Sequence, residues 1–436
     1  MLLIFAGCSD KEDCSNSVDD DGNGEMDCYD IGCAFTKACE LNTNDRSVAS
    51  SLHTILGEEN KIELDSLGNV YLCYQPEYYD YQIQKFDKNL NRLWFTSVKG
   101  CSGFVLSDDE TALFHSQWTS GGVYEHTVRS PATGQVMAHA LITYPTDANT
   151  ILPFTRYKNG RFYMVSLAEV DTPGESYRYD SFLYIQIYDS QLNEVTRVGH
   201  KFVDVTGKNG YLGLKDVAIM DDGRIAIIGY GKDGYLGGTL VENDDLIASF
   251  NIQGTLLHAK TFTTTTCMNN TCTITSSGTR IVASKTDNRI DIYSTDLAFL
   301  DQLSVVHPFS AELRFRPLHM VGNTIFLGGT ATVGEWSNGF NGPIPLIGQY
   351  SLVTHTLEWS KLLWTYYPSD DGYYSNVSLD TIQLISRGNH ILWSGSSFHP
   401  YFPSDERVYE NRWIEYTSMA LFDTSPPEGY SGRLYR

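Results

Sequence analysis

The chain has 436 residues with 53 acidic and 31 basic side chains, which gives a formal net charge of −22 at pH 7. Nucleic acid is therefore not an expected partner, because phosphate binding needs a basic surface. No stretch of the sequence is apolar for long enough to cross a bilayer as a helix.

Residues 1–8 form a short apolar run that ends in Ala-Gly-Cys. This run resembles the end of a bacterial lipoprotein signal, which implies lipidation at Cys8 and a membrane partner through that lipid anchor. The implied location is the cell envelope, at the outer membrane surface or in the periplasm, or outside the cell. The alternative is a short apolar end without a lipid.

Eight cysteines remain besides Cys8, and an even number is typical of exported proteins that carry disulfides. Four of them precede residue 40, and these are Cys14, Cys28, Cys33 and Cys39. Cys267 and Cys272 are close enough in sequence to close a small loop. Zinc binding by the first four is disfavoured, because their spacing is irregular.

Residues 19–30 read DDDGNGEMDCYD, with oxygen-bearing side chains at positions 1, 3, 5, 9 and 12 and glycine at position 6. This is the spacing of an EF-hand-type calcium loop. The expected calcium ligands are Asp19, Asp21, Asn23, Asp27, Asp30 and the backbone carbonyl of Glu25. A Cys-rich, Asp-rich calcium-binding segment is expected at 9–42. Within it, residues 13–39 resemble the Cys-framed, Asp-rich repeats of secreted bacterial surface proteins, in which disulfides hold the calcium loop in place of helices. The alternative is a disordered acidic linker.

A linker at residues 43–59 precedes a pattern of two successive β-hairpins that recurs about seven times. Asn-Gly and Asp-Gly pairs at 159–160 and 222–223 mark hairpin turns. Each unit gives four strands, A to D. In the fourth unit we expect them at 214–220, 224–230, 245–251 and 255–262.

A repeat of this length predicts an all-β chain that folds as a β-propeller of about seven four-stranded blades over residues 60–436. The segment KFDKNLNRLW at Lys85–Trp94 resembles a blade of bacterial propellers with PQQ-like repeats. The blade-docking motif of that family is incomplete, and Asp boxes and Trp-Asp dipeptides are absent from the sequence. The alternatives are a β-sandwich or two smaller β domains. Either Gly432–Arg436 or Ser51–Leu56 supplies the strand that closes the ring.

Antiparallel strands place the A–B and C–D turns on one face, the turn face, and the B–C and D–A connections on the other, the loop face. We expect short connections on the turn face. We expect long B–C loops at 75–80, 169–180, 231–244, 331–345 and 397–413, with only the fifth unit short. Long loops on a rigid scaffold usually carry binding residues. Cys73 and Cys101 are expected to meet on the loop face.

The loop face is rich in aromatic residues, which make good contacts with sugars and peptides. These ligand-binding candidates are Tyr78, Tyr79, Trp118, Tyr177, Tyr179, Tyr235, Trp336, Phe340, Tyr401, Phe402 and Trp413. Packing between blades is the alternative role for the same rings.

No linear catalytic motif occurs in the sequence, so no catalytic residue is predicted. The favoured function is a secreted, lipid-anchored binding or scaffold module for a glycan or protein ligand. A propeller enzyme acting at the loop face, either a glycan hydrolase or lyase or a quinone-dependent dehydrogenase, is the second hypothesis. A purely structural surface component is the third. Carboxylate, His or Arg groups that converge from three or more blades in a deep pocket would favour the enzyme.

Overall fold

The computed structural model is entirely built of β-strands in the residues that it describes. These residues are 50–52, 61–77, 80–88, 91–120, 123–143, 148–150, 153–171, 179–205, 210–262, 267, 272–286, 289–304, 312–332, 343–362, 376–377, 383–388, 390–399 and 414–423. Within them, no helix has the length and apolar character that a bilayer span requires.

Seven sheets of four or five strands follow one another along the chain, and we number them blades 1 to 7. Blade 1 pairs β2 (Lys61–Leu64), β3 (Val70–Glu77), β4 (Asp80–Phe86) and β5 (Arg92–Val98) in that order. Blade 2 pairs β6 (Gly103–Leu106), β7 (Leu113–Ser120), β8 (Val123–Arg129) and β9 (Val136–Thr143). Blade 3 pairs β11 (Phe154–Lys158), β12 (Arg161–Asp171), β13 (Tyr179–Tyr188) and β14 (Glu194–Lys201), and β10 (Ala148–Thr150) also pairs with β12.

The later blades repeat the same order. Blade 4 contains β16 (Tyr211–Ile219), β17 (Ile225–Lys232), β20 (Asp244–Phe250) and β21 (Leu256–Phe262). Blade 5 contains β22 (Ile274–Ser277), β23 (Arg280–Thr286), β24 (Arg289–Ser294) and β25 (Phe299–Ser304). Blade 6 contains β26 (Glu312–Val321), β27 (Thr324–Thr332), β28 (Pro343–Ser351) and β29 (Thr356–Leu362). The fourth-unit strands therefore lie within about three residues of their predicted positions.

Blade 7 combines the two ends of the chain. It contains β31 (Gln383–Arg387), β32 (His390–His399) and β33 (Ile414–Asp423), and β30 (Asn376–Val377) also pairs with β32. Its outermost strand is β1 (Ser50–Leu52), which pairs antiparallel with β33. Of the two predicted ring closures, the structure therefore has the one in which the N-terminal side supplies the last strand.

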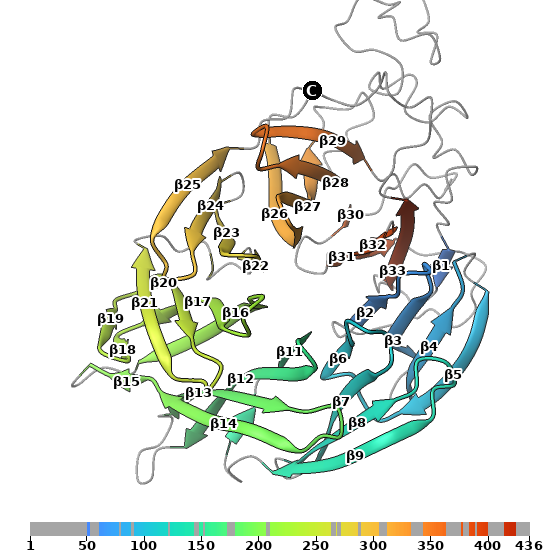
Figure 1. The fold of residues 1–436 in the computed structure, drawn as a ribbon, viewed down its shortest axis with the longest axis horizontal. Helices are drawn as coiled ribbons and strands as arrows, with labels where there is room; N and C mark the ends of the chain where they lie inside the picture. Colours follow the sequence, from blue (N-terminus) through green and yellow to red (C-terminus); the bar gives the residue numbers. More distant parts are fainter. Residues whose placement is uncertain are drawn as a thin grey trace, which may run out of the picture.

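The sheets stand around a common axis with their A strands innermost (Figure 1). The A strands contact one another in a closed circle: β2 with β6, β6 with β11, β11 with β16, β16 with β22, β22 with β26, β26 with β31, and β31 with β2. This arrangement is a β-propeller, as predicted. The number of blades in the whole chain stays a prediction, because not every residue is described.

Buried apolar side chains fill the spaces between successive blades. One cluster joins Val165, Leu183 and Ile185 of blade 3 to Ile225 and Leu246 of blade 4. Blade 3 is apolar on both faces for this reason, since one face packs against blade 4 and the other against blade 2. The outer D strands keep exposed alternate positions, as in β5 and β14.

The turn residues explain the short connections on the turn face. Asn159 and Gly160 have positive φ angles of 51° and 76°, as a two-residue hairpin turn between right-twisted strands requires. Asp-x-x-x-Asn turns recur as well: in two C–D turns, the carboxylates of Asp87 and Asp189 accept bonds from the backbone and side-chain amides of Asn91 and Asn193.

Three expectations about the loop face are wrong. The predicted loop at 75–80 is mostly strand, since β3 extends to Glu77, and Pro76 lies within the register shift between Tyr74 and Glu77. The B–C connection of blade 2 is also short, since β7 ends at Ser120 and β8 begins at Val123. The predicted loop at 231–244 instead contains β18 (Gly234–Leu236) and β19 (Thr239–Val241), which form a small sheet with β15 (Val203–Asp204).

That small sheet lies at the outer margin of the molecule beside β21 (Figure 1). Its side chains Leu236 and Val241 are buried in the cluster between blades 3 and 4. The insertion therefore extends the core outward rather than covering the axis.

Candidate functional site

The structure places the predicted aromatic residues unevenly. Trp118 lies near the loop-face end of β7, and 54% of its surface is exposed. Tyr235 is half-buried in β18 at the outer margin, so it does not belong to a surface around the axis. Tyr179 begins β13. The other candidates lie outside the described residues: Tyr78, Tyr79, Tyr177, Trp336, Phe340, Tyr401, Phe402 and Trp413.

The predicted calcium ligands, Cys8 and the four cysteines before residue 40 also lie outside the described residues. Calcium binding and lipidation therefore stay predictions.

Two disulfides stiffen D–A connections on the loop face. Cys101, just before β6, is joined to Cys73 of β3, and Cys267 is joined to Cys272 between β21 and β22. All four residues are buried. Both connections lead into A strands, so the crosslinks fix the chain where it enters the centre of the ring.

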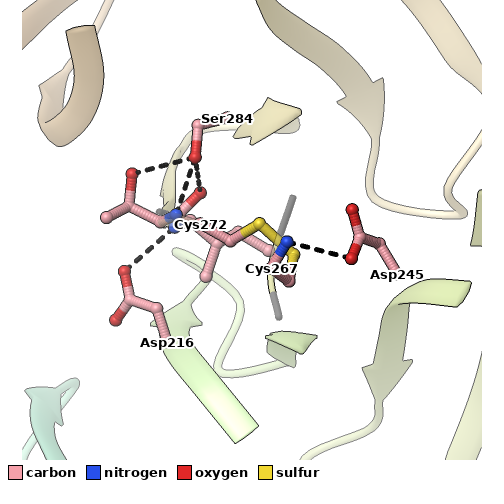
Figure 2. The surroundings of a disulfide bond; sticks show 7 residues. Asp216, Asp245, Cys267, Cys272 and Ser284 are labelled. Atoms are coloured by element: carbon pink, nitrogen blue, oxygen red, sulfur yellow. Dashed lines mark hydrogen bonds between the residues drawn. A yellow bond between two sulfur atoms is a disulfide. The ribbon is translucent and has the colours of Figure 1, made fainter. Parts of the chain in front are cut away.

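The second disulfide segment is anchored on three sides, as Figure 2 shows. The amide of Cys267 donates to Oδ1 of Asp245 at 2.9 Å. The amide of Thr273 donates to Oγ of Ser284 at 2.7 Å, and the amide of Ile274 donates to Oδ2 of Asp216 at 2.9 Å. The segment between blades 4 and 5 is therefore held by both blades before any ligand arrives.

In two places, side chains of the kinds that bind metal ions lie close together, but their cysteine sulfurs are joined in disulfides. Cys73 and Cys101 lie beside His115, and Cys267 and Cys272 lie beside Asp245, with ligand atoms within 4.8 Å of one another in each group. Metal binding needs thiolates, and here the sulfurs are oxidised to disulfides. These groups are interpreted as packing around the crosslinks.

Charged side chains converge on the axis from five blades. Glu63, Arg156, Asp216, His319 and Arg387 all lie on A strands, and we call them the axial cluster. Arg156 and Arg387 both act electrostatically on Glu63 and on His319. Residues from four different blades are therefore near one another at the centre.

Each member of the axial cluster is bonded to another blade. Nη2 of Arg156 lies 2.6 Å from Oδ1 of Asp216, and Nη1 of Arg387 donates to the carbonyl of Ser107 at 3.0 Å. Asp216 accepts the Ile274 amide, the Leu106 amide bonds to Glu63, and His319 bonds to the backbone of Ser386. Each A strand has one edge whose backbone N–H and C=O groups lack a strand partner. The side chains of the axial cluster bond to some of these groups.

Burial sets the protonation of the cluster. It raises the pKa of Glu63 to about 7, although Arg387 and the Leu106 amide act in the opposite direction. Burial also lowers the pKa of His319 to about 4, with Arg387 acting in the same direction. Charged groups from several blades therefore do converge, as an enzyme would require. These groups are already bonded to residues of neighbouring blades.

On the turn face, polar side chains also join neighbouring blades. Oγ and the amide of Ser66 donate to the carboxylate of Glu110 in the next blade. Lys158 pairs with Asp221 at 2.8 Å, and Asp221 accepts the Gly278 amide at 2.6 Å. The polar groups of the turn face therefore serve contacts between blades.

Sequence reasoning missed a group of side chains near the loop-face end of the junction between blades 2 and 3. It consists of Phe182, Tyr184 and Lys201, which lie on β13 and β14. The rings of Phe182 and Tyr184 are stacked, with centroids 6.0 Å apart. The signal in the sequence was Gly199 within a strand, since glycine there often marks a close approach by an aromatic ring.

No family model and no curated protein matches this chain. Solved structures match it loosely. BamB from Moraxella catarrhalis is 10% identical, with 80% of this chain and 96% of that chain covered and a TM-score of 0.37. The polysaccharide lyase Uly1 is 8% identical, and the match covers 85% of this chain and 90% of the lyase chain with a TM-score of 0.45. A Penicillium chrysogenum alpha-L-arabinanase complexed with arabinobiose is 11% identical, with 70% and 99% covered and a TM-score of 0.41.

Similarity at this level carries no argument about activity. The assignment of this chain to the β-propeller fold rests on its own sheets and on the closed circle of its A strands.

Proposed function

We propose that this protein is an exported, lipid-anchored binding or scaffold module whose ligand face is the loop face. The observation that supports this choice most strongly is the position of the disulfides, since both of those described stiffen connections on that face. A binding surface that is ordered in advance loses less entropy when a ligand binds.

The opposite face offers less to a ligand. Its turns are short, and its charged groups bond from blade to blade, as Ser66 with Glu110 and Lys158 with Asp221 do. Catalysis at the axis is not part of the proposal, because the axial cluster is engaged in the same kind of contact.

The cysteines support an exported location. Disulfides persist in oxidising compartments, and the resemblance of residues 1–8 to a lipoprotein signal supports a location at a membrane of the cell envelope. The proposed ligands are glycans or proteins, and nucleic acid is not among them.

A ligand screen with the full chain tests the face assignment. The protein carries Cys8→Ser to prevent lipidation and is probed on glycan and peptide arrays. We expect hits that are lost when Trp336→Ala, Tyr401→Ala and Trp413→Ala are combined, because these rings belong to predicted loop-face connections. Val353→Ser is the matched control, since Val353 is 69% exposed in a C–D turn of blade 6. Hits that survive the triple variant and vanish in the control would overturn the assignment.

The proposed calcium loop gives a second test. Titration of the full chain with CaCl₂ in oxidising buffer is expected to show one site with a dissociation constant of about 10⁻⁴ to 10⁻³ M, the range of extracellular modules. The combined variant Asp19→Ala and Asp21→Ala removes two ligands and is expected to abolish the binding heat. Equal heat from this variant and from the parent would contradict the proposed ligand set.

A further inference from the structure

The outermost strand of each of blades 1 to 6 has one edge that pairs with no other described strand. These strands are the D strands β5, β9, β14, β21, β25 and β29. Such an edge presents backbone N–H and C=O groups that can pair with another chain, and proteins usually protect it with charged side chains, prolines or bulges. The sequence of each D strand therefore indicates how well its edge is protected.

Strand β9 has the least protected edge of the six. It is eight residues long, reads VMAHALIT, and lies at the outer margin of the molecule (Figure 1). It alone among these six strands contains no Asp, Glu, Lys or Arg. In β5, for comparison, the Arg92 guanidinium lies 4.9 Å from the centroid of the exposed Phe95 ring. A bulge near the start of β9 recurs in the other five D strands, so it does not set β9 apart.

Strand β9 combines this uncharged edge with a row of exposed side chains. Met137, His139 and Leu141 alternate along the strand, and Met137 and Leu141 are 54% and 62% exposed. Between them, Ala138 and Ala140 pack against the core cluster that joins blades 2 and 3. The core therefore fixes the position of the strand, while two large apolar side chains stay in water.

We propose that β9 is a dimerisation strand that pairs antiparallel with β9 of a second copy of this chain. The sequence around His139 is nearly symmetric, since Val-Met-Ala precedes this residue and Ala-Leu-Ile follows it. A two-fold axis through His139 sets Met137 opposite Leu141 of the second copy. Side chains directly opposite in an antiparallel pair lie on the same face of the sheet, so each exposed apolar side chain meets another. On the other face, the same axis sets Ala138 opposite Ala140.

This symmetry favours a second copy over a different protein as the occupant. A closed two-fold interface needs a surface that is complementary to itself, and β9 meets this condition through its order of side chains. A strand from an unrelated protein would require no such symmetry. The proposed dimer uses the outer margin of blade 2, so the inference goes beyond the proposed function and does not depend on it.

Charge also limits where two copies can meet. Each copy carries a net charge of −22, so two copies repel each other over most of their surfaces. Strand β9 has no carboxylate of its own, and Nε2 of His139 lies 3.0 Å from Oε1 of Glu125 in the same blade. Contact through this strand therefore adds little repulsion. Because salt screens the rest, we expect the dimer to become stronger as the ionic strength rises.

Sedimentation of the full chain with Cys8→Ser, over a series of protein concentrations at low and at high NaCl, tests the dimer. We expect a monomer–dimer equilibrium that shifts toward the dimer at high salt. Leu141→Lys is expected to weaken dimerisation by about tenfold or more, because a two-fold interface contains each substitution twice and loses two apolar contacts. Leu300→Lys is the matched control, since Leu300 is 53% exposed on the D strand β25. Urea unfolding confirms that both variants are folded.

Cysteine crosslinking tests the register of the two strands. Two cysteines at position 139 would lie directly opposite each other, within reach of a disulfide. His139→Cys is therefore expected to link the two copies under oxidising conditions. Thr143→Cys is the control, because the two copies of position 143 lie eight residue positions apart along the paired strands, about 26 Å at the rise of a β-strand. Peptide mapping identifies the linked residues.

Three results from sedimentation would overturn the dimerisation strand. They are a parent that stays monomeric at every concentration, a dimer that Leu141→Lys leaves intact, and equal weakening by Leu300→Lys. Crosslinking through Thr143→Cys but not through His139→Cys would overturn the proposed pairing as well. A monomer that binds phosphatidylglycerol vesicles and loses them in Leu141→Lys would assign the strand to a lipid surface instead. The proposed function would survive each of these results, because its array test depends on the loop face.

Discussion

Lowering the pH from 6.5 to 4.5 is expected to remove roughly 2 kcal/mol of stability for each fully buried histidine, because the loss approaches about 1.4 kcal/mol per pH unit once the unfolded chain is protonated. His126 is the clearest case. Its ring is 0% exposed and lies 5.4 Å from the Phe114 ring and 5.6 Å from the Tyr188 ring. Among the described residues, neither ring nitrogen has a hydrogen-bond partner.

The sign follows from the folded-state pKa values. Burial lowers the pKa of His126 to about 3 and that of His115 to about 4, against about 6.5 in an unfolded chain. Below pH 6.5 both histidines become protonated in the unfolded chain, whereas they stay neutral in the folded chain. The contribution of each histidine to the free energy of unfolding is therefore fully present above pH 6.5, and it is lost as the pH drops toward 4 for His115 and toward 3 for His126. His115 retains a bond to the Gly100 carbonyl at 2.7 Å, which partly offsets the effect of burial.

Urea unfolding of the parent and of His126→Phe at pH 7.5, 6.5, 5.5 and 4.5 measures this effect. The variant should lose about 1.4 kcal/mol less than the parent per pH unit in the acid range. It should be at least as stable at pH 7.5, since phenylalanine leaves no unpaired buried polar group. His258→Gln is the control, because His258 is exposed. Parallel pH profiles for the parent and His126→Phe would contradict the buried neutral histidine.

Removal of the Cys73–Cys101 disulfide is expected to cost roughly 3.5 kcal/mol, and removal of Cys267–Cys272 roughly 2 kcal/mol. The difference comes from the loops that the crosslinks close, which have sequence separations of 28 and 5 residues. A longer closed loop removes more conformational freedom from the unfolded chain.

The paired variants Cys73→Ala with Cys101→Ala and Cys267→Ala with Cys272→Ala are matched controls for each other. All four cysteines are buried, so the cavities left by the lost sulfurs are similar. Urea unfolding under oxidising conditions gives both free energies. A larger loss for the Cys267–Cys272 pair would contradict the loop-length argument and would point instead to the anchored segment around Asp245 and Asp216.

The propeller was predictable because its local signals agree with its global geometry. Asn159-Gly160 fixes a hairpin turn through its backbone angles, and a continuous apolar run such as Ile225–Ile228 marks a strand that is buried on both faces. The Cys73–Cys101 pair was predictable for the same reason, since strand order alone brings the first D–A connection beside strand B of blade 1.

The remaining features depend on contacts that no local pattern encodes. A proline normally interrupts a central strand. Strand β3 continues past Pro76 because the register shifts there. The axial cluster joins residues as far apart as Ser107 and Arg387, which are 280 positions apart in sequence. The stacked pair of Phe182 and Tyr184 was missed because both residues read as ordinary strand residues, and only the cross-strand position of Gly199 lets the Tyr184 ring lie against the sheet.

Hydrogen exchange of the full chain with and without the tightest array ligand tests the central claim most directly. Ligand binding on the loop face predicts slower exchange in peptides that cover 99–103, 114–124 and 262–274, where the D–A connections and the end of β7 lie. Peptides that cover the turns at 65–69, 107–112 and 220–224 should exchange at unchanged rates. Protection confined to those turns, with none at the disulfide-linked connections, would contradict the assignment of the ligand to the loop face.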